Sequence, residues 1–302
     1  MHWLDRISVG WLKRTPIFAD GWGEVEPLAP YGEKLKTRAP GVGLTIQWSD
    51  PKRERGLTVQ DGTAQSPAEI LPASLRTMHV RRLLTPRTAL RRLILPPSWG
   101  DAGYGARMWL AGALVARGLE VWLLEGAYFG VRAAPMTKVE DFFRMGLGHI
   151  EEIRALLQTH HDDQVATSLA GYSMAGQLGG MAVQSMPHDV PVVLMSCAPS
   201  PDTVFVDGPL KSQVQWAKLG EGAEAKLGDF MRRVSVLDLP APTSVRRGVA
   251  LNTGDGIVNP AATERIGAHF GVEVKRFPTG HMGAYVFWRR ELQRFIAQTV
   301  LD

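Results

Sequence analysis

The sequence predicts an α/β fold in which helices cover both faces of a mostly parallel central sheet. From residue 78 onward, short apolar runs alternate with helix-like stretches, which is the pattern of parallel strands joined by crossover helices. The 302 residues, 45% of them hydrophobic, are enough to bury one large core or a core with a cap. We therefore expect residues 77–302 to form one α/β domain and residues 1–76 to be an extension packed on it.

Composition argues against several classes of function. The net charge is +4, from 34 basic and 30 acidic residues without a long Lys/Arg run, so we expect no nucleic-acid partner. The single cysteine, Cys197, cannot form an internal disulfide, and no Cys/His cluster has zinc-ligand spacing, so we expect neither a metal nor a cofactor. No apolar run has the length of a bilayer span or resembles a secretory signal, which favours a soluble cytoplasmic protein.

Residues 1–13 predict a short amphipathic helix that ends before Pro16. Two interpretations remain open at this stage: the helix docks on the protein's own core, or residues 1–14 make a peripheral contact with a membrane surface. The predicted apolar side carries Trp3, Leu4, Ile7, Trp11 and Leu12, and the residues off that side are Asp5, Arg6 and Lys13.

Residues 17–76 are rich in Pro and Gly and predict an irregular N-terminal layer without catalytic chemistry. Strand-like pieces occur at 44–48 and 57–60, and Asp61-Gly62 predicts a turn.

The predicted core follows in order along the chain. A capping box at 137–140 opens its longest helix. The predicted strands are 93–95, 121–124, 165–170, 192–195, 249–251 and 272–277, and the predicted helices are 106–116, 137–158, 177–186, 259–270 and 283–300. Residues 199–242 break this rhythm with a Pro-rich start and two helical pieces, which predicts a cap insertion.

Three motifs at predicted strand ends carry the chemistry. Ser173 lies in Gly171-Tyr-Ser-Met-Ala-Gly176, between an apolar strand and a helix, where small neighbours permit the tight turn of a nucleophile elbow. Asp255 lies in Asn252-Thr-Gly-Asp-Gly256, and His281 in Thr279-Gly-His-Met-Gly283. Serine needs a base to become a nucleophile, and the base needs a carboxylate to orient it. We therefore predict the triad Ser173, His281 and Asp255.

Two backbone N–H groups are predicted to form the oxyanion hole. One belongs to Met174 after the nucleophile, and the other to Trp99 in the loop 98–103. We expect the substrate pocket to be lined by Tyr104, Tyr172, Phe205 and Trp216.

The order Ser, Asp, His resembles that of α/β-hydrolases. More narrowly, the chain resembles a branch of α/β-hydrolase-domain-containing proteins with animal and bacterial members. Ala175 is a departure, because relatives usually have glycine there. The likeness spans almost the full length and rests on Phe18-Ala-Asp-Gly-Trp-Gly23, Asp61-Gly62, Ser66-Pro67, Gly100-Asp101, Leu124-Glu-Gly-Ala-Tyr-Phe-Gly130, Gly171-Tyr-Ser-Met-Ala-Gly176 and Gly280-His-Met-Gly-Ala-Tyr285.

The resemblance implies an α/β-hydrolase fold and a serine hydrolase of small-molecule acyl esters, which include lipid esters and thioesters. Two alternatives stay open. An acyltransferase can use the same triad, and a protein with this fold can bind a ligand without catalysis. The sequence does not decide the oligomeric state.

Overall fold

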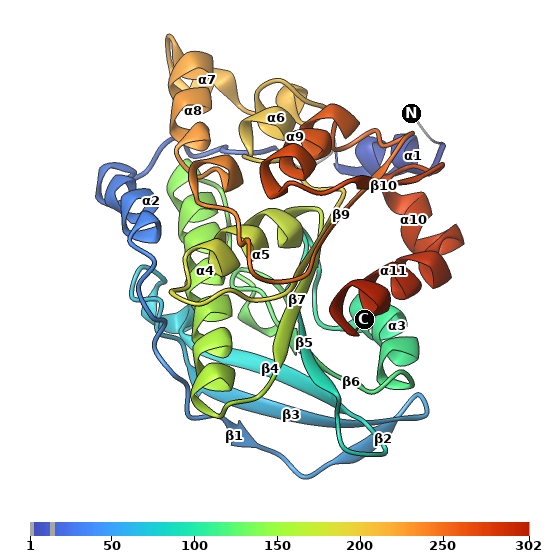
Figure 1. Ribbon diagram of the computed structural model, residues 1–302. Helices are drawn as coiled ribbons and strands as arrows, with labels where there is room; N and C mark the ends of the chain where they lie inside the picture. Colours follow the sequence, from blue (N-terminus) through green and yellow to red (C-terminus); the bar gives the residue numbers. More distant parts are fainter. Residues whose placement is uncertain (1–2, 13–15, 302) are drawn as a thin grey trace.

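The computed structural model describes residues 3–12 and 16–301 and has a central twisted sheet between two layers of helices (Figure 1). Among these residues the sheet has ten strands in the order β1-β3-β4-β6-β5-β7-β8-β9-β10, with β2 paired to β3. The strands from β6 to β10 are parallel, and those from β1 to β6 are antiparallel along that order. The predicted fold class is confirmed. The strands are β1 (Gln47–Trp48), β2 (Lys52–Glu54), β3 (Leu57–Gln65), β4 (Thr77–Leu84), β5 (Arg91–Leu95), β6 (Leu119–Leu124), β7 (Thr167–Tyr172), β8 (Val192–Met195), β9 (Arg247–Asn252) and β10 (Val274–Phe277).

Each face of the sheet has its own hydrophobic core. In β5, Ile94 packs with the α4 and α5 side, whereas Leu93 and Leu95 pack with the α3 and α11 side, because successive strand residues point to opposite faces. Buried parallel strands therefore read as continuous apolar runs, which is why the sequence located them. The helices of one layer are α4 (Val139–Asp162), α5 (Met174–Gln184) and α9 (Pro260–Phe270), and those of the other are α3 (Gly105–Val115) and α11 (Arg289–Leu301).

The predicted final helix, residues 283–300, is two helices in the structure. They are α10 (His281–Phe287) and α11, and they are separated at Trp288, whose φ of −114° and ψ of 17° leave the helical region. The break lets α10 begin at His281 while α11 packs against α3.

The capping box predicted at 137–140 is wrong by one residue. Asp141 supplies the capping oxygen and accepts hydrogen bonds from the backbone N–H groups of Thr137 (3.1 Å) and Lys138 (3.0 Å). Glu140 is engaged elsewhere, because its carboxylate accepts the N–H of Glu24 at 2.9 Å. The N-cap of α4 is Lys138, one residue later than predicted, which makes Asp141 the third helical residue and thus the capping acid.

The region 44–65 is more regular than predicted. Asp61 and Gly62 lie within β3, not in a turn, and the chain turns instead between β2 and β3, where Arg55 and Gly56 have positive φ. The turn prediction is therefore wrong. Strand pairing prevails because β3 pairs along its whole length with β4 or with shorter strands.

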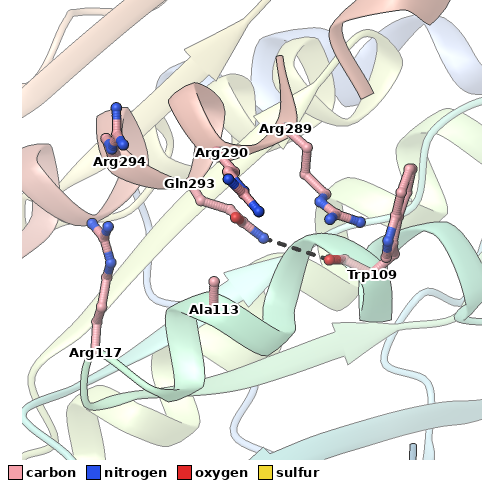
Figure 2. Close-up of a pocket in the computed structure, with 7 residues that line it drawn as sticks. All are labelled: Trp109, Ala113, Arg117, Arg289, Arg290, Gln293 and Arg294. Carbon is pink, nitrogen blue, oxygen red and sulfur yellow. Dashed lines mark hydrogen bonds between the residues drawn. The ribbon is translucent and has the colours of Figure 1, made fainter. Parts of the chain in front are cut away.

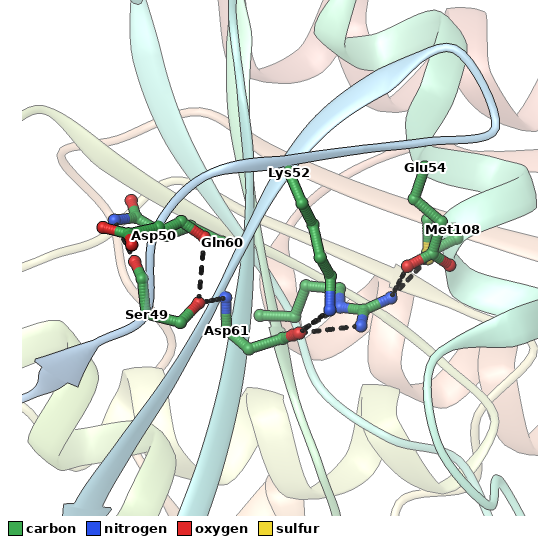
Figure 3. Close-up of polar contacts among 8 residues, drawn as sticks. Ser49, Asp50, Lys52, Glu54, Gln60, Asp61 and Met108 are labelled. Carbon is green, nitrogen blue, oxygen red and sulfur yellow. Dashed lines mark hydrogen bonds and ion pairs between the residues drawn. The ribbon is translucent and has the colours of Figure 1, made fainter.

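A charged cluster joins these N-terminal strands (Figure 3). The Asp61 carboxylate accepts hydrogen bonds from Lys52 Nζ (2.7 Å) and from Arg81 Nε (2.6 Å). Burial would raise the pKa of Asp61, but these hydrogen bonds outweigh it and hold the pKa below its ordinary value. Asp61 thus links β2 to β4 across β3 and has a structural role.

The N-terminal helix α1 (Trp3–Leu12) packs against α10. The predicted apolar side is wrong in its first turns, because Trp3 is 57% and Ile7 61% exposed, while Asp5 is fully buried. The side chains of Trp11 and Leu12 lie outside the described residues, as does Lys13. The membrane contact of residues 1–14 stays a prediction. No helix in the described part of the chain has the length and apolarity to cross a bilayer.

Between β8 and β9 the chain forms the helical insertion predicted at 199–242. Leu227 and Met231 of this insertion are fully buried against the α4 and α5 layer. The insertion lies at the same end of the molecule as α1 and α9 (Figure 1). Its function as a cap stays a prediction, as does the domain boundary at residue 76. Its helices are α6 (Asp202–Phe205), α7 (Trp216–Leu219) and α8 (Ala223–Arg232).

Candidate active site

Ser173 occupies the sharp turn between β7 and α5. Its backbone has φ 58° and ψ −129°, a conformation that L-residues rarely adopt and that costs on the order of 1–3 kcal/mol. The turn leaves no room at Gly171, where an added Cβ would lie 2.2 Å from the carbonyl oxygen of Ala175. Ala175 itself is accommodated, so the departure from glycine at this position does not disturb the turn.

Asp255 and His281 are joined directly. His281 Nδ1 and Asp255 Oδ2 lie 2.7 Å apart, and both side chains are buried. The other carboxylate oxygen of Asp255 accepts the N–H groups of Ile257 (2.9 Å) and Val258 (2.8 Å). These hydrogen bonds fix the orientation of the carboxylate, which in turn orients the imidazole.

The three predicted residues share one edge of the sheet. Ser173 follows β7, Asp255 follows β9 and His281 follows β10, and all three strands are parallel. The carboxyl ends of parallel strands meet at one edge, where ligands bind in open α/β sheets.

Tyr172 connects the serine turn to the histidine. Its hydroxyl donates a hydrogen bond to the carbonyl oxygen of His281 (2.6 Å) and accepts one from Asn252 Nδ2 (2.6 Å). Its ring centroid lies 5.0 Å from that of His281. The Tyr172 side chain is buried in these contacts. The expectation that it lines the substrate pocket stays a prediction.

The loop that carries Trp99 is held against the elbow. Ser98 Oγ donates a hydrogen bond to the carbonyl oxygen of Tyr172 at 2.7 Å. Arg107, whose side chain is buried, binds Asp101 Oδ2 (2.5 Å) and the carbonyl oxygens of Leu95 (2.9 Å), Leu124 (2.6 Å) and Gly103 (2.8 Å). One arginine thus ties this loop to the ends of β5 and β6. This role could not be predicted from the sequence, because an arginine within a predicted helix carries no signal of its own.

The predicted pocket residues separate into two groups. Phe205 of the insertion packs against Trp99, with ring centroids 5.6 Å apart, so the structure brings these two together. Trp216 donates its indole N–H to the Lys211 carbonyl oxygen within the insertion (3.0 Å). Tyr104 lies apart from these residues. It faces Arg81 of β4 and lines a hollow beside β3 and β4.

A hollow of about 650 Å³ lies beside the loop that follows β9 and carries Asp255. It is lined by the segment 255–257, by the start of α9, and by Thr203 and Asp207 of the insertion. The insertion therefore borders the loop that carries Asp255.

Asp5 of α1 contacts the candidate site, although its place in the sequence predicts a solvent-facing side chain. One carboxylate oxygen accepts the N–H groups of His281 (2.8 Å) and Gly256 (2.9 Å), and the other accepts the N–H of Met282 (2.9 Å). One buried side chain thus connects the loop of Asp255 to the first turn of α10. An acid in an amphipathic helix normally faces solvent, so the sequence held no signal for this contact.

A strained serine after a central strand, a buried Asp–His pair at the same edge and the observed strand order together define an α/β-hydrolase. The chain belongs to the family described as alpha/beta hydrolase domain containing 18, whose model matches residues 15–239. The matched region includes Ser173 and ends before Asp255 and His281.

Solved structures with the same fold include three esterases. The chain is similar to acetyl xylan esterase from Paenibacillus sp. R4, with 12% identity, a TM-score of 0.63 and coverage of 96% of this chain and 99% of that chain. Acetyl xylan esterase 1 from Thermoanaerobacterium sp. JW/SL YS485 has 12% identity, a TM-score of 0.60 and coverage of 96% and 98%. A cold-adapted esterase from an Arctic intertidal metagenomic library has 14% identity, a TM-score of 0.59 and coverage of 84% and 99%. At these identities the likeness concerns the fold. A comparison with curated proteins found no match.

Proposed function

We propose that the protein is a serine hydrolase that cleaves carboxylic esters through an acyl-enzyme on Ser173. The observation that carries the proposal is the 2.7 Å contact between His281 and Asp255, at the same sheet edge as a serine held at φ 58°. The backbone strain at Ser173 needs a functional reason, because it lowers stability.

In this mechanism, Ser173 Oγ attacks the ester carbonyl while His281 Nε2 takes the hydroxyl proton. The C–O bond to the leaving group breaks, and the same proton passes to the departing alcohol. Water then attacks the acyl-enzyme with His281 again as base. Asp255 orients the imidazole and stabilises its protonated form.

The oxyanion of each tetrahedral intermediate would accept the N–H groups of Met174 and Trp99. Met174 is the first residue of α5, so its N–H has no partner within that helix. The contacts of Ser98 and Arg107 hold the Trp99 loop in place, which is the preorganisation that such stabilisation requires.

Asp5 and Tyr172 are positioning residues in this proposal. Asp5 holds the His281 and Gly256 amides, and Tyr172 holds the His281 carbonyl, so the Asp–His pair is fixed from both sides. A misplacement of about 1 Å in such a group can cost about 10²-fold in rate.

The proposal includes thioesters and lipid esters as candidate substrates. Acetyl esters also belong among them, because two proteins of similar fold are acetyl xylan esterases. An acyltransferase would use the same residues with an alcohol in place of water.

The test is turnover of a panel of acyl esters of increasing chain length, with and without an added alcohol as acceptor. Ser173→Ala and His281→Ala should abolish turnover, and Asp255→Asn should retain more activity than either, although the loss is about 10⁴-fold in a known triad. Ser185→Ala, which removes another serine at the end of α5, should turn over esters at the wild-type rate. Full activity in Ser173→Ala would refute the proposal.

A further inference from the structure

A groove of about 360 Å³ between α3 and α11 is lined by four arginines (Figure 2). Its other lining residues are Trp109, Ala113 and Gln293. The arginines are Arg117, which follows α3, and Arg289, Arg290 and Arg294 of α11. Figure 2 shows Arg117 extending from the α3 side toward α11, so basic groups face the groove from both walls.

Little negative charge balances these arginines. Within residues 3–12 and 16–301, the acidic oxygen within 4 Å of any of the four is that of Glu291, which lies 3.9 Å from Arg294 Nη1. Arg290 and Arg294 are also four residues apart on one helix, a spacing at which like charges repel. The cluster therefore opposes folding of α11 as long as the groove holds no anion.

The helix dipole adds to this cost. Arg289 and Arg290 are the first two residues of α11, and the N-terminus of a helix carries partial positive charge. Cations are favoured at the other end of a helix, and the N-terminus favours anions. The partial positive charge of the α11 N-terminus and the charges of its two arginines therefore both favour a bound anion.

Arg289 is held in place at one wall of the groove and keeps an unused hydrogen-bond donor. Its guanidinium stacks on the Trp109 ring, 3.8 Å from the ring centroid. Its Nη1 atom is buried and has no hydrogen-bond partner among the described residues. Gln293, which donates to the Leu110 carbonyl oxygen at 2.7 Å, fixes the neighbouring turn of α11 against α3. Arginine is the side chain best suited to bidentate binding of phosphate, and stacking on an indole holds this one at the wall of the groove.

We propose that this groove is a binding site for a phosphate-bearing anion. Four guanidiniums match the multiple charges of a phosphoryl ligand better than the single charge of a carboxylate. The groove volume is at the lower end of small-ligand sites, which fits a compact group such as pyrophosphate or the headgroup of a phospholipid. The site lies on a different helix pair from Ser173, so the proposal does not depend on the hydrolase activity.

The test uses the purified full-length protein in a phosphate-free buffer of low ionic strength. Sodium pyrophosphate should bind by calorimetry and raise the Tm more than sodium chloride does at equal ionic strength. Arg289→Gln and Arg290→Gln should each weaken pyrophosphate binding at least tenfold. The matched control, Arg87→Gln in the exposed loop before β5, should bind like the wild type.

A second readout is the Tm of the protein in the absence of pyrophosphate. Arg290→Gln should raise the Tm without pyrophosphate, because it removes repulsion and an unfavourable dipole contact, and should reduce the stabilisation by a given pyrophosphate concentration. An arginine that serves only the fold would give a lower Tm and unchanged binding. That result would overturn the proposal.

Vesicles distinguish the source of the phosphate group. Sedimentation with phosphatidylglycerol vesicles but not phosphatidylcholine vesicles, lost in Arg289→Gln, together with no pyrophosphate binding, would assign a lipid headgroup. Binding of pyrophosphate alone would assign a soluble ligand. Neither binding, or binding that persists in both groove variants, would end the proposal.

Discussion

Ser173 and Tyr172 show how adjacent residues can serve the site in different ways. Ser173 lies in the strained turn, and Tyr172 is buried with its hydroxyl on the His281 carbonyl oxygen. Burial raises the pKa of Tyr172 well above its ordinary value, so the phenol keeps its proton at any ordinary assay pH. The hydroxyl therefore holds His281 independently of pH.

The residue-scale prediction concerns Tyr172→Phe. The change leaves the His281 carbonyl and the Asn252 amide without their shared partner, so we expect a stability loss of about 1–3 kcal/mol. We also expect kcat on a short ester to fall about tenfold with KM little changed, because His281 loses its support. Steady-state kinetics and urea unfolding measure both effects. Tyr31→Phe in α2 (Ala29–Lys36) is the control, and an unchanged kcat in Tyr172→Phe would show that the hydroxyl does not position His281.

The sequence singled out the candidate site residues more readily than the side chains that hold them. Ser173, Asp255 and His281 stand out because small residues and turns surround them at strand ends, and their catalytic roles stay a prediction. Tyr172 and Arg107 were not recognised as supports, because several of their partners are backbone carbonyl groups, and a carbonyl leaves no trace in the sequence.

At the scale of elements, α1 depends on one buried acid. Asp5 accepts three N–H groups, one from the Asp255 loop and two from the first turn of α10, whereas its helix neighbours Arg6 and Ile7 are exposed. Amphipathic pattern alone assigns such an acid to the solvent side. Asp5 was therefore placed on the solvent side, because the pattern cannot show that the surface under α1 carries backbone N–H groups without another partner among the described residues.

We expect Asp5→Asn to loosen the site without unfolding the protein. An amide keeps one acceptor oxygen and turns an NH₂ group toward a backbone donor, so at least one of the three contacts is lost. Hydrogen exchange should then accelerate at Gly256, His281 and Met282, and reaction with a fluorophosphonate should slow about tenfold. Arg6→Gln, on the exposed side of α1, should change neither. Wild-type exchange in Asp5→Asn would contradict this role.

Helix α4 makes stability depend on pH. Burial, aided by the charges of Arg132 and Arg92 respectively, lowers the pKa of both His149 and His160 to about 3. In the unfolded chain a histidine has a pKa of about 6.5, so between these values only the unfolded state takes up protons. Stability is therefore lost as pH falls below about 6.5.

The expected slope is up to about 1.4 kcal/mol per pH unit for each histidine. Denaturant unfolding between about pH 4.5 and 6.5 measures it, since most carboxylates titrate lower. His160→Gln should make the dependence shallower, and the double variant with His149→Gln should make it shallower still. An equal slope in all three proteins would mean that these histidines are protonated in the folded state.

On the scale of the whole molecule, periodicity predicted the parallel part of the sheet and the helices on both faces. It was less informative about the N-terminal strands, where Asp61-Gly62 reads as a turn but lies in β3. The side chain at Trp48 explains the glycine, because an added Cβ at Gly62 would lie 2.7 Å from the Trp48 ring. A glycine in the sequence can therefore indicate either a turn or a close packing contact, and at Gly62 it is the packing contact.

The insertion between β8 and β9 is expected to select the acyl chain. Phe205 contacts Trp99, whereas Trp216 donates a hydrogen bond to Lys211 within the insertion. A change at Trp216 is therefore the control for a change at Phe205. Phe205→Leu should shift the preferred ester length by at least two carbons, and Trp216→Leu should lower the Tm with an unchanged profile. An ester panel and thermal unfolding give both results. Identical chain-length profiles in the two variants would count against a cap.

The proposed mechanism requires that Ser173 is the acylated nucleophile. The most direct measurement is mass spectrometry of the protein after reaction with a fluorophosphonate probe, followed by digestion to locate the adduct. We expect one adduct, on Ser173, which is absent in Ser173→Ala and forms far more slowly in His281→Ala because no base removes the proton. An adduct on another residue, or one that persists in Ser173→Ala, would contradict it.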